Sequence, residues 1–468
     1  MRENASISNR TAGRVAMKAK SARELALITL YKIETEGVRA EVHLNRSLIA
    51  LKGDARDKAL ARELCSGVLR WRLKIDYVLS RFCRDGLEGL NPWIRNVLRL
   101  GAYQLLYLDR IPPWAAINES VKLARRYGHR GTVGLVNGVL RSIDRERESI
   151  GYPSLSESAL RHISVVHSHP EWLVRRWMDR FGLEAALTIC KEYNELPPLT
   201  VRANPLRTTP RRLAEILQNQ GLRAVPCSYA ARGIKLYGCG DPSELEAFRE
   251  GLFQVQDEAS MLAAQLLAPS EGMSILDCCA GLGGKTSWAA EEMNNRGQVV
   301  ALDVYRDRLS RLVENCGRLG IDIVHPAVMD SSGPSGLMGL FDAVLVDAPC
   351  SGLGVLHKHP EIKWRRRPED LTRLSALQLK ILENAARFVR PGGVMVYSTC
   401  TVEPEENQEV INAFLSMEGG FELENAASFL PEGAGEFITP EGFFLSFPER
   451  GGMDGFFAAR LRKHTGSS

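Results

Sequence analysis

Five short apolar segments recur through the second half of the chain, and most of them are followed by a stretch with helical periodicity. Segments of this length, separated by amphipathic helices, are typical of parallel strands that are buried on both faces of a sheet. The pattern therefore predicts a doubly wound, mainly parallel α/β sheet of the Rossmann-like type. The five segments are residues 274–277, 298–304, 321–329, 341–347 and 394–399.

The last part of the chain adds two further extended segments, residues 443–447 and 456–461, with a glycine-rich stretch between them. Two such segments joined by glycines are typical of a β-hairpin. We expect this antiparallel hairpin to lie at the edge of the parallel sheet.

The first part of the chain lacks the alternation and reads as helices throughout. Ile94, Leu98, Leu105 and Leu108 fall on one face at helical spacing. Between the two parts, short helices and strands are mixed, which predicts a small α+β module. The predicted domains are a disordered basic arm (1–20), an all-α domain (21–150), an α+β connecting module (151–255) and the α/β domain (256–468).

Charge is distributed unevenly along the chain. Residues 1–150 hold 28 Lys and Arg against 16 Asp and Glu, a formal charge of +12, whereas the whole chain carries only +4. A basic region joined to an acidic remainder is typical of a polyanion-binding module attached to a second activity. We expect nucleic acid as the partner, with a merely solvated basic surface as the alternative.

Composition argues against several other classes of protein. No apolar run reaches the roughly 18 residues of a membrane span, and the first residues lack the apolar core of a secretory signal. The ten cysteines include no Cys-x-x-Cys pair, so a zinc site is not expected, and without a secretory signal a disulfide framework is not expected either. These features favour a cytoplasmic protein with reduced thiols and no metal.

A glycine-rich loop follows the first predicted strand and reads DCCAGLGGKT over residues 277–286. A phosphate-binding Walker A loop needs glycine where Cys279 stands, and a dinucleotide-binding loop needs glycine where Thr286 stands. The remaining use of such a glycine loop is close packing on a nucleoside that carries no pyrophosphate, which indicates S-adenosylmethionine as the ligand. The alternative is that the loop is an ordinary tight turn between a strand and a helix. The expected cofactor-binding residues of this loop are Cys279, Ala280, Gly281, Leu282, Gly283, Gly284 and Lys285.

Acidic residues end the following strands, on the side where ligands bind in open α/β sheets. Asp303 ends the second strand and is expected to accept hydrogen bonds from both ribose hydroxyls. Asp330 ends the third segment and could accept from the adenine amino group, although an exposed loop acid is an equal alternative. Asp347 ends the fourth strand and completes the expected cofactor-binding set.

Two cysteines follow two strands that we expect to be neighbours. Cys350 lies in DAPCSG after the fourth segment, and Cys400 lies in STC after the fifth. Pro349 has no N–H and ends the first of these strands, so both thiols should reach the carboxyl edge of the sheet. A single cysteine is usually core filler. Two at strand ends beside a cofactor loop indicate catalysis.

Longer motifs make the chain similar to a known family. PPWAAINESVKLARRYG and GLVNGVLRSI resemble the RNA-binding NusB-like domain that precedes some ribosomal RNA methyltransferases. DAPCSG, STC, the DxCA–GGK loop, the EEN of residues 405–407, HPEIKWRRRPED and DGFFAARLRK resemble the RNA cytosine-5 methyltransferases. With the helical domain, the chain resembles the RsmB/Sun/Fmu class acting on 16S rRNA. Gly281 and Leu282 depart from it, because the family loop usually has Ala-Pro there, which puts cofactor affinity in question.

The resemblance implies a function and a role for the site residues. It implies methyl transfer from S-adenosylmethionine to C5 of a cytosine in 16S rRNA, an activity of the cytosine-967 type, by a monomer acting before full subunit assembly. It also implies that Cys400 attacks C6 of the base and that Cys350 assists breakdown of the adduct. Asp347 can hydrogen-bond the N3/N4 edge of the cytosine. The alternatives are the same chemistry on tRNA or another RNA, and a non-catalytic RNA-binding factor with a vestigial second domain.

Positive charge near the expected site has two sources. Lys285 could favour ionisation of the Cys400 thiol, with a water-facing lysine at a helix start as the alternative. The second source is the stretch after DAPCSG, where cations beside an aromatic suit RNA phosphates and bases. That stretch contains His357, Lys358, His359, Lys363, Trp364, Arg365, Arg366 and Arg367.

Overall fold

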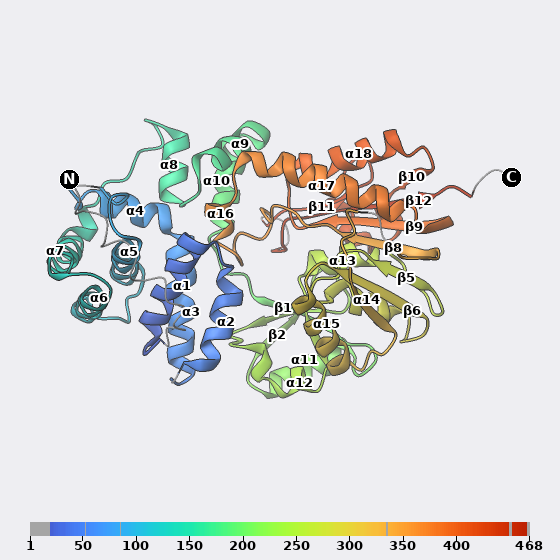
Figure 1. Cartoon of the computed structure of the whole chain (residues 1–468), viewed down its shortest axis with the longest axis horizontal. Helices are drawn as coiled ribbons and strands as arrows, with labels where there is room; N and C mark the ends of the chain where they lie inside the picture. The colour runs from blue at the N-terminus through green and yellow to red at the C-terminus, as the bar shows by residue number, and fades with distance from the viewer. Residues whose placement is uncertain (1–18, 52, 85, 334–335, 449–451, 466–468) are drawn as a thin grey trace, which may run out of the picture. The chain divides into compact units, whose positions relative to one another are not determined.

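The structure is a computed structural model that describes residues 19–465 except 52, 85, 334–335 and 449–451 (Figure 1). The chain divides into two compact units, one that ends at Glu171 and one that begins at Trp172. Residues 1–18, most of the predicted basic arm, lie outside the described residues. Residues 151–171 belong to the first unit, so the segment expected as a connecting module is shared between the two units.

The first unit is built from helices packed around a central one, α5 (Pro92–Tyr107). The others are α1 (Ala22–Glu36), α2 (Ala40–Ala50), α3 (Ala55–Arg70), α4 (Arg72–Ser80), α6 (Pro113–Tyr127), α7 (Arg130–Glu146) and α8 (Ala159–Val166). Asn91 caps α5 by accepting a hydrogen bond from the Trp93 N–H at 2.9 Å, and Pro92 occupies its first turn. α5 buries apolar side chains such as Leu98 against α1, α3, α4, α6 and α7. The predicted all-α character of this region is confirmed.

The second unit opens with two helices and a small antiparallel sheet in the order β2-β3-β1-β4. Its elements are α9 (Glu171–Phe181), α10 (Leu183–Glu192), β1 (Leu199–Ala203), α11 (Pro210–Asn219), β2 (Arg223–Pro226), β3 (Gly233–Tyr237), α12 (Glu246–Arg249) and β4 (Phe253–Val255). Leu213 and Leu217 of α11 pack into one core with Val201, Ile234 and Phe253 of the strands. The predicted α+β character of this region is confirmed.

The predicted parallel sheet follows, with its strands in the order β10-β12-β9-β8-β5-β6-β7 and β11 paired to β12. The strands are β5 (Ser274–Asp277), β6 (Gln298–Asp303), β7 (Val324–Val328), β8 (Phe341–Asp347), β9 (Val389–Thr399), β10 (Phe421–Glu424), β11 (Phe444–Ser446) and β12 (Phe456–Lys463). The helices are α13 (Glu258–Gln265), α14 (Gly284–Glu292), α15 (Arg306–Leu319), α16 (Ile362–Arg365), α17 (Pro368–Ala386) and α18 (Gln408–Met417). β5 to β9 are parallel, and the last three strands are antiparallel to their neighbours.

Alternate residues of the central strands enter two separate cores, as the two-residue period of a strand requires. Ala343 and Leu345 of β8 pack with α13, α14 and α15 on one face of the sheet (Figure 1). Val344 and Val346 pack with α17 and α18 on the other face. Because both faces are covered, the strand must be apolar at every central position, and the predicted doubly wound sheet is confirmed.

The C-terminal strands β11 and β12 form the predicted antiparallel pair at the edge of the parallel strands, because β12 pairs with β9, the outermost of them, and β11 pairs with the far side of β12. β10 also pairs with that far side, so within the whole sheet β12 is an inner strand. Residues 456–461 are all buried, which requires neighbours on both sides of the strand.

Candidate active site

The carboxyl ends of β8 and β9 bring the two predicted catalytic thiols together. Asp347 is in register with Ser398 across these parallel strands, so the chain leaves both strands at the same edge. The Sγ atoms of Cys350 and Cys400 lie 3.2 Å apart, and both side chains are partly exposed. The predicted proximity of the thiols is confirmed. The hydrogen bond to Cys400, together with burial, raises the pKa of the Cys350 thiol well above its usual range.

The loop that carries Cys350 is held from two sides. Arg366 donates hydrogen bonds to the carbonyl of Cys350 at 2.9 Å and to that of Ser351 at 2.7 Å. The buried carboxylate of Glu406 accepts from the Ser351 N–H at 2.8 Å and from Gln378 at 2.9 Å. Arg366 and Glu406 therefore hold the backbone around Cys350.

The loop after Cys400 is anchored by buried polar side chains. Asn407 donates to the carbonyl of Thr401 at 3.0 Å, and Arg180 of α9 pairs with the fully buried Glu403 at 3.0 Å. Buried polar groups with several partners restrict a loop to one conformation. The backbone on both sides of the thiol pair is thus held in place by residues distant in the sequence.

Asp347 connects β8 to the neighbouring strand and to the glycine-rich loop. Its carboxylate accepts from the Ser398 hydroxyl at 2.8 Å and pairs with the Lys285 ammonium at 2.8 Å. The Lys285 Nζ also lies 4.7 Å from the ring centroid of Phe456, and the lysine is only 7% exposed. The alternative of a water-facing lysine is therefore wrong. Its partner in the structure is Asp347, so the suggested effect on Cys400 stays a prediction.

The glycine-rich loop turns between β5 and α14 through two residues with left-handed backbone. Gly281 has a φ of 56° and Gly283 a φ of 86°, values that residues with a Cβ rarely adopt. A Cβ on Gly283 would lie 2.8 Å from Cγ of Leu312, whereas a Cβ on Gly281 would meet no atom nearer than 4.0 Å. Gly283 is thus packed against α15, and Gly281 leaves open space beside bare backbone, which suits an adenosyl group.

The remaining residues of the expected loop set follow this turn. Cys279 is partly exposed, and burial raises the pKa of its thiol. The Ala280 N–H donates to the carbonyl of Leu302 in β6 at 2.8 Å. Leu282, at the departure from the family loop, is 48% exposed, and its carbonyl accepts from Asn315 of α15 at 3.1 Å. The loop is therefore tied to β6 and α15 although it lacks the usual proline.

Asp303 and Asp330, the two acids expected to bind the nucleoside, differ in their surroundings. Asp303 is 5% exposed and accepts from the N–H groups of Gly281 at 3.1 Å and Tyr305 at 2.8 Å, and it pairs with Arg308 at 3.3 Å. Asp330 is exposed and accepts from the N–H and hydroxyl of Ser332, which lower the pKa of its carboxyl. Asp303 thus contacts the glycine-rich loop, and a cofactor contact for either acid stays a prediction.

The predicted RNA-contacting stretch after Cys350 contains both buried and exposed side chains. His357 is 4% exposed and bonds to Asp454 at 2.8 Å, and Lys363 is 1% exposed. The expected RNA contact is therefore wrong for His357 and Lys363, because their charged groups are enclosed by the fold. Arg365 and Arg367 are exposed and keep the predicted role as a proposal.

Asp277, at the end of β5, supports the glycine-rich loop from the sheet. Its carboxylate accepts from the Cys279 N–H at 3.2 Å and from the Thr286 hydroxyl at 2.7 Å. Burial raises the pKa of this carboxyl to about 7, against the opposing effect of the two hydrogen bonds.

We expect the contribution of Asp277 to stability to fall as pH rises. In the unfolded chain its carboxyl titrates near the usual pKa of 3.8, and in the folded protein at a pKa of about 7. Between these values the folded state keeps a proton that the unfolded state has lost, so the free energy of unfolding declines up to about pH 7. Denaturant titrations at about pH 5 and about pH 8 should show the Asp277→Asn variant gaining stability relative to wild type as pH rises. A difference that does not change with pH would contradict this assignment.

Sequence reasoning missed three contributors to the site. Ser398 could have been found, because it lies in register with Asp347 on the neighbouring strand. Arg366 was expected at RNA but holds the Cys350 loop. Phe456 gives no local signal, because it reaches Lys285 from a strand near the end of the chain.

Two further features are absent from the part of the chain that the structure describes. None of its helices is both long and apolar enough to cross a bilayer. No group of three or more potential ligands is arranged to hold a metal ion there.

Family models match three consecutive parts of the chain. Residues 264–462 match the 16S rRNA methyltransferase RsmB/F, residues 20–145 match the NusB family, and residues 169–241 match the ferredoxin-like domain of RsmF/B-like methyltransferases. These ranges correspond to the large sheet, the helices around α5 and most of the small antiparallel sheet. The predicted NusB-like and methyltransferase folds are confirmed.

Relatives cover nearly the whole chain. The "Probable ribosomal RNA small subunit methyltransferase B" of Bacillus subtilis is 37% identical over 96% of this chain and 100% of its own length. The "Ribosomal RNA small subunit methyltransferase B" of Salmonella newport is 35% identical over 87% of this chain and 91% of its own length.

Solved structures show the same architecture. The crystal structure of PH0851 has a TM-score of 0.80 and 27% identity, covering 94% of this chain and 99% of that one. NSun6 from Pyrococcus horikoshii, solved with the S-adenosylmethionine analogue SFG, has a TM-score of 0.57 and 25% identity, covering 64% of this chain and 99% of that one. Together with the thiol pair beside the glycine-rich loop, these similarities show that the chain belongs to the RsmB/F family of 16S rRNA methyltransferases, with S-adenosylmethionine as its cofactor.

Proposed function

We propose that this rRNA methyltransferase methylates C5 of a cytosine in 16S rRNA through a covalent bond between Cys400 and C6 of the base. The observation that carries the proposal is the 3.2 Å distance between the Sγ atoms of Cys400 and Cys350, at the edge of the sheet where ligands bind. Methyl transfer to a ring nitrogen or a ribose hydroxyl needs no thiol, because those atoms have lone pairs of their own. A nucleophilic thiol is needed where the acceptor is C5 of cytosine, and a second thiol beside it can assist release of the product.

C5 of cytosine is too weakly nucleophilic to take a methyl group directly, and the thiol pair can activate it. The Cys400 thiolate adds to C6, forming an S–C6 bond and turning C5 into an enamine carbon. S-adenosylmethionine would supply an electrophilic methyl group on its sulfonium. C5 takes up that group as its bond to the sulfonium sulfur breaks, which would leave a neutral thioether as the other product. Cys350 then helps to remove the C5 proton. The S–C6 bond breaks, the C5–C6 double bond is restored, and the bonding electron pair returns to the sulfur of Cys400.

Asp347 is proposed to hold the base during these steps. Its carboxylate can accept a hydrogen bond from the amino group on the N3/N4 edge of cytosine and stabilise the charge shift when C6 is attacked. The bonds from Lys285 and Ser398 orient the carboxylate before the base arrives. Proton-handling groups of this kind typically contribute about 10²–10⁴-fold to the rate.

The cofactor is proposed to lie over the turn at Gly281, where the backbone is bare and the space beside it is open. Cys279 to Lys285 would line it. Asp303 would bind the ribose hydroxyls, exchanging its 3.3 Å contact with Arg308 for the ligand. Asp330 would bind the adenine amino group from its exposed position, and Asp347 would lie between cofactor and base.

RNA recognition is proposed for the surface formed by α6 and α7 in the first unit. A hollow of about 280 Å³ there is lined by Trp114, Asn118, Asn137 and Arg141, among others. Trp114 is 72% exposed, which suits stacking on an unpaired base, and exposed arginines such as Arg125 suit phosphates. A target base must also leave its stack to reach the thiols. We therefore propose 16S rRNA before full subunit assembly as the substrate, and a monomeric enzyme acting in the cytoplasm.

The test is to map methylated bases in 16S rRNA after incubation with the purified full-length protein and S-adenosylmethionine. The expected result is a methyl group at C5 of one cytosine, of the cytosine-967 type, and no modification of tRNA under the same conditions. Methylation of a ring nitrogen or a ribose would contradict the proposal. Modification of tRNA alone would show that the substrate is tRNA and not 16S rRNA.

A further inference from the structure

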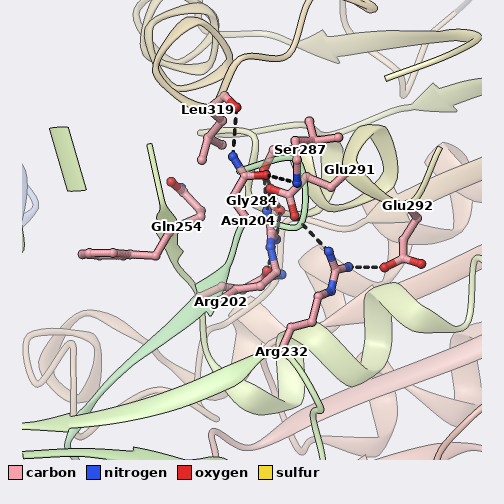
Figure 2. Close-up of polar contacts among 12 residues, drawn as sticks. Arg202, Asn204, Arg232, Gln254, Gly284, Ser287, Glu291, Glu292 and Leu319 are labelled. Carbon is pink, nitrogen blue, oxygen red and sulfur yellow. Dashed lines mark hydrogen bonds and ion pairs between the residues drawn. The ribbon is translucent and has the colours of Figure 1, made fainter. Parts of the chain in front are cut away.

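Arg202 of β1 lies fully buried against the first turns of α14, the helix that follows the glycine-rich loop (Figure 2). Its guanidinium donates to the Gly284 carbonyl at 2.9 Å, to the Ser287 hydroxyl at 3.0 Å and to the Glu291 carboxylate at 2.7 Å. It also bonds to the side chain of Gln256. We call Arg202, Gln256, Gly284, Ser287 and Glu291 the Arg202 cluster.

The Arg202 cluster follows the geometry of a helix. Gly284, Ser287 and Glu291 are spaced three and four residues apart, so they form one stripe along α14. A planar guanidinium with several N–H groups can reach all of them from a single position. One side chain from the small antiparallel sheet therefore sets both the rotation of α14 about its axis and the position of its first residue.

The first residues of α14 are also those that face the active site. Gly284 ends the glycine-rich loop, and the next residue, Lys285, pairs with Asp347 at 2.8 Å. The chain of contacts thus runs from Arg202 to the Gly284 carbonyl, then through the backbone to Lys285 and Asp347. A small rotation of α14 would move both the turn at Gly281 and the Lys285 ammonium.

The Arg202 cluster is hard to explain by stability alone. Arg202 and Glu291 are both fully buried in their side chains, and replacing such a pair by apolar residues often costs no stability. The Nε of Arg202 is buried with no hydrogen-bond partner among the described residues, so the arginine is not even fully satisfied. Because the buried arginine adds little stability, its presence indicates that the guanidinium is needed to position α14.

We propose that Arg202 is a positioning residue that holds the glycine-rich loop and Lys285 in the geometry that binds S-adenosylmethionine. The small antiparallel sheet, in which no catalytic residue has been placed, then becomes part of the cofactor site. This inference rests on the proposed place of the cofactor over Gly281. It does not depend on which atom of the RNA receives the methyl group.

The chain offers a matched control in Asn204, one residue beyond β1. Its side-chain amide donates to the carbonyls of Gly251 and Leu319, both at 2.9 Å (Figure 2). These bonds join the small sheet to the end of α15, and none of them involves the glycine-rich loop. Loss of the Asn204 side chain should loosen the packing of the small antiparallel sheet against the helices of the large sheet without moving the first turn of α14.

The experiment compares full-length Arg202→Lys and Asn204→Ala with wild type. Lysine keeps the charge opposite Glu291 but cannot bond Gly284, Ser287 and Gln256 together. Calorimetric titration without RNA should show S-adenosylmethionine binding to Arg202→Lys weakened about tenfold or more, and to Asn204→Ala within about twofold of wild type. Both variants should melt at lower temperature. In turnover assays Arg202→Lys should raise KM for the cofactor and leave KM for rRNA unchanged.

A second substitution keeps the proposal testable if Arg202→Lys does not fold. Ser287→Ala removes the bond from Arg202 to the Ser287 hydroxyl and the 3.1 Å bond from that hydroxyl to the Gly284 carbonyl, and it leaves the buried ion pair intact, so it should fold and still weaken cofactor binding measurably. Wild-type cofactor affinity in both Arg202→Lys and Ser287→Ala would overturn the proposal. An equal loss of affinity in Asn204→Ala would also overturn it, because the effect would then follow general loosening of the interface. Since RNA is absent, these outcomes are independent of whether C5 of cytosine is methylated.

Discussion

Replacing Cys400 with alanine is expected to abolish methyl transfer to 16S rRNA while leaving RNA binding intact. Without the thiol no S–C6 bond can form, and C5 stays too weakly nucleophilic to accept a methyl group. Removal of a catalytic nucleophile typically lowers turnover by about 10⁴- to 10⁶-fold. Transfer of a labelled methyl group from S-adenosylmethionine to 16S rRNA measures the loss, and filter binding measures RNA affinity.

Cys239→Ala is the matched control for this prediction. Cys239 is another partly exposed free thiol, and it lies after β3 in the small antiparallel sheet. Its replacement should leave methyl transfer unchanged. Activity near wild type in Cys400→Ala would remove this residue from the role of nucleophile.

Replacing Cys350 with alanine is expected to trap the reaction after methyl transfer. Cys400 can still add to C6, but without the neighbouring thiol 3.2 Å away the C5 proton is removed slowly and the S–C6 bond persists. A protein–RNA band that resists denaturation should accumulate on gels, and multiple turnover should cease. The methyl group should be present on the trapped RNA.

The double variant with alanine at both Cys350 and Cys400 separates this trap from tight non-covalent binding. It cannot form the S–C6 bond, so it should give no denaturation-resistant band. If Cys350→Ala yields only free protein on such gels, the division of labour between the two thiols is incorrect.

The meeting of the two thiols was predictable, because it follows from local patterns combined with one rule of sheet geometry. The apolar runs that became β8 and β9 identify the strands, and Pro349 marks where the first of them ends. Parallel neighbours deliver their carboxyl ends to the same edge of a sheet, so Cys350 and Cys400 had to come close. The 3.2 Å separation itself depends on the loops held by Arg366 and Glu406.

The burial of charged residues was not predictable from the same patterns. His357 and Lys363 look like a solvated basic stretch, yet His357 is paired with Asp454, 97 positions further along the chain. The strand β10 beyond β12 was missed for a similar reason, since it depends on pairing with β12. Periodicity reports which face of an element is apolar, but it does not report which distant residue covers a charge.

Residue types and their spacing were enough to establish the alternation of strands and helices, the glycine-rich turn, the two strand-end cysteines and the resemblance to RNA cytosine-5 methyltransferases. Each of these is a local property, written in residue type and spacing. The folded arrangement was needed to show that Lys285 pairs with Asp347, that His357 and Lys363 are buried, and that Arg202 reaches the first turn of α14. These depend on hydrogen bonds and ion pairs between residues far apart in the chain, whose partners are chosen by packing.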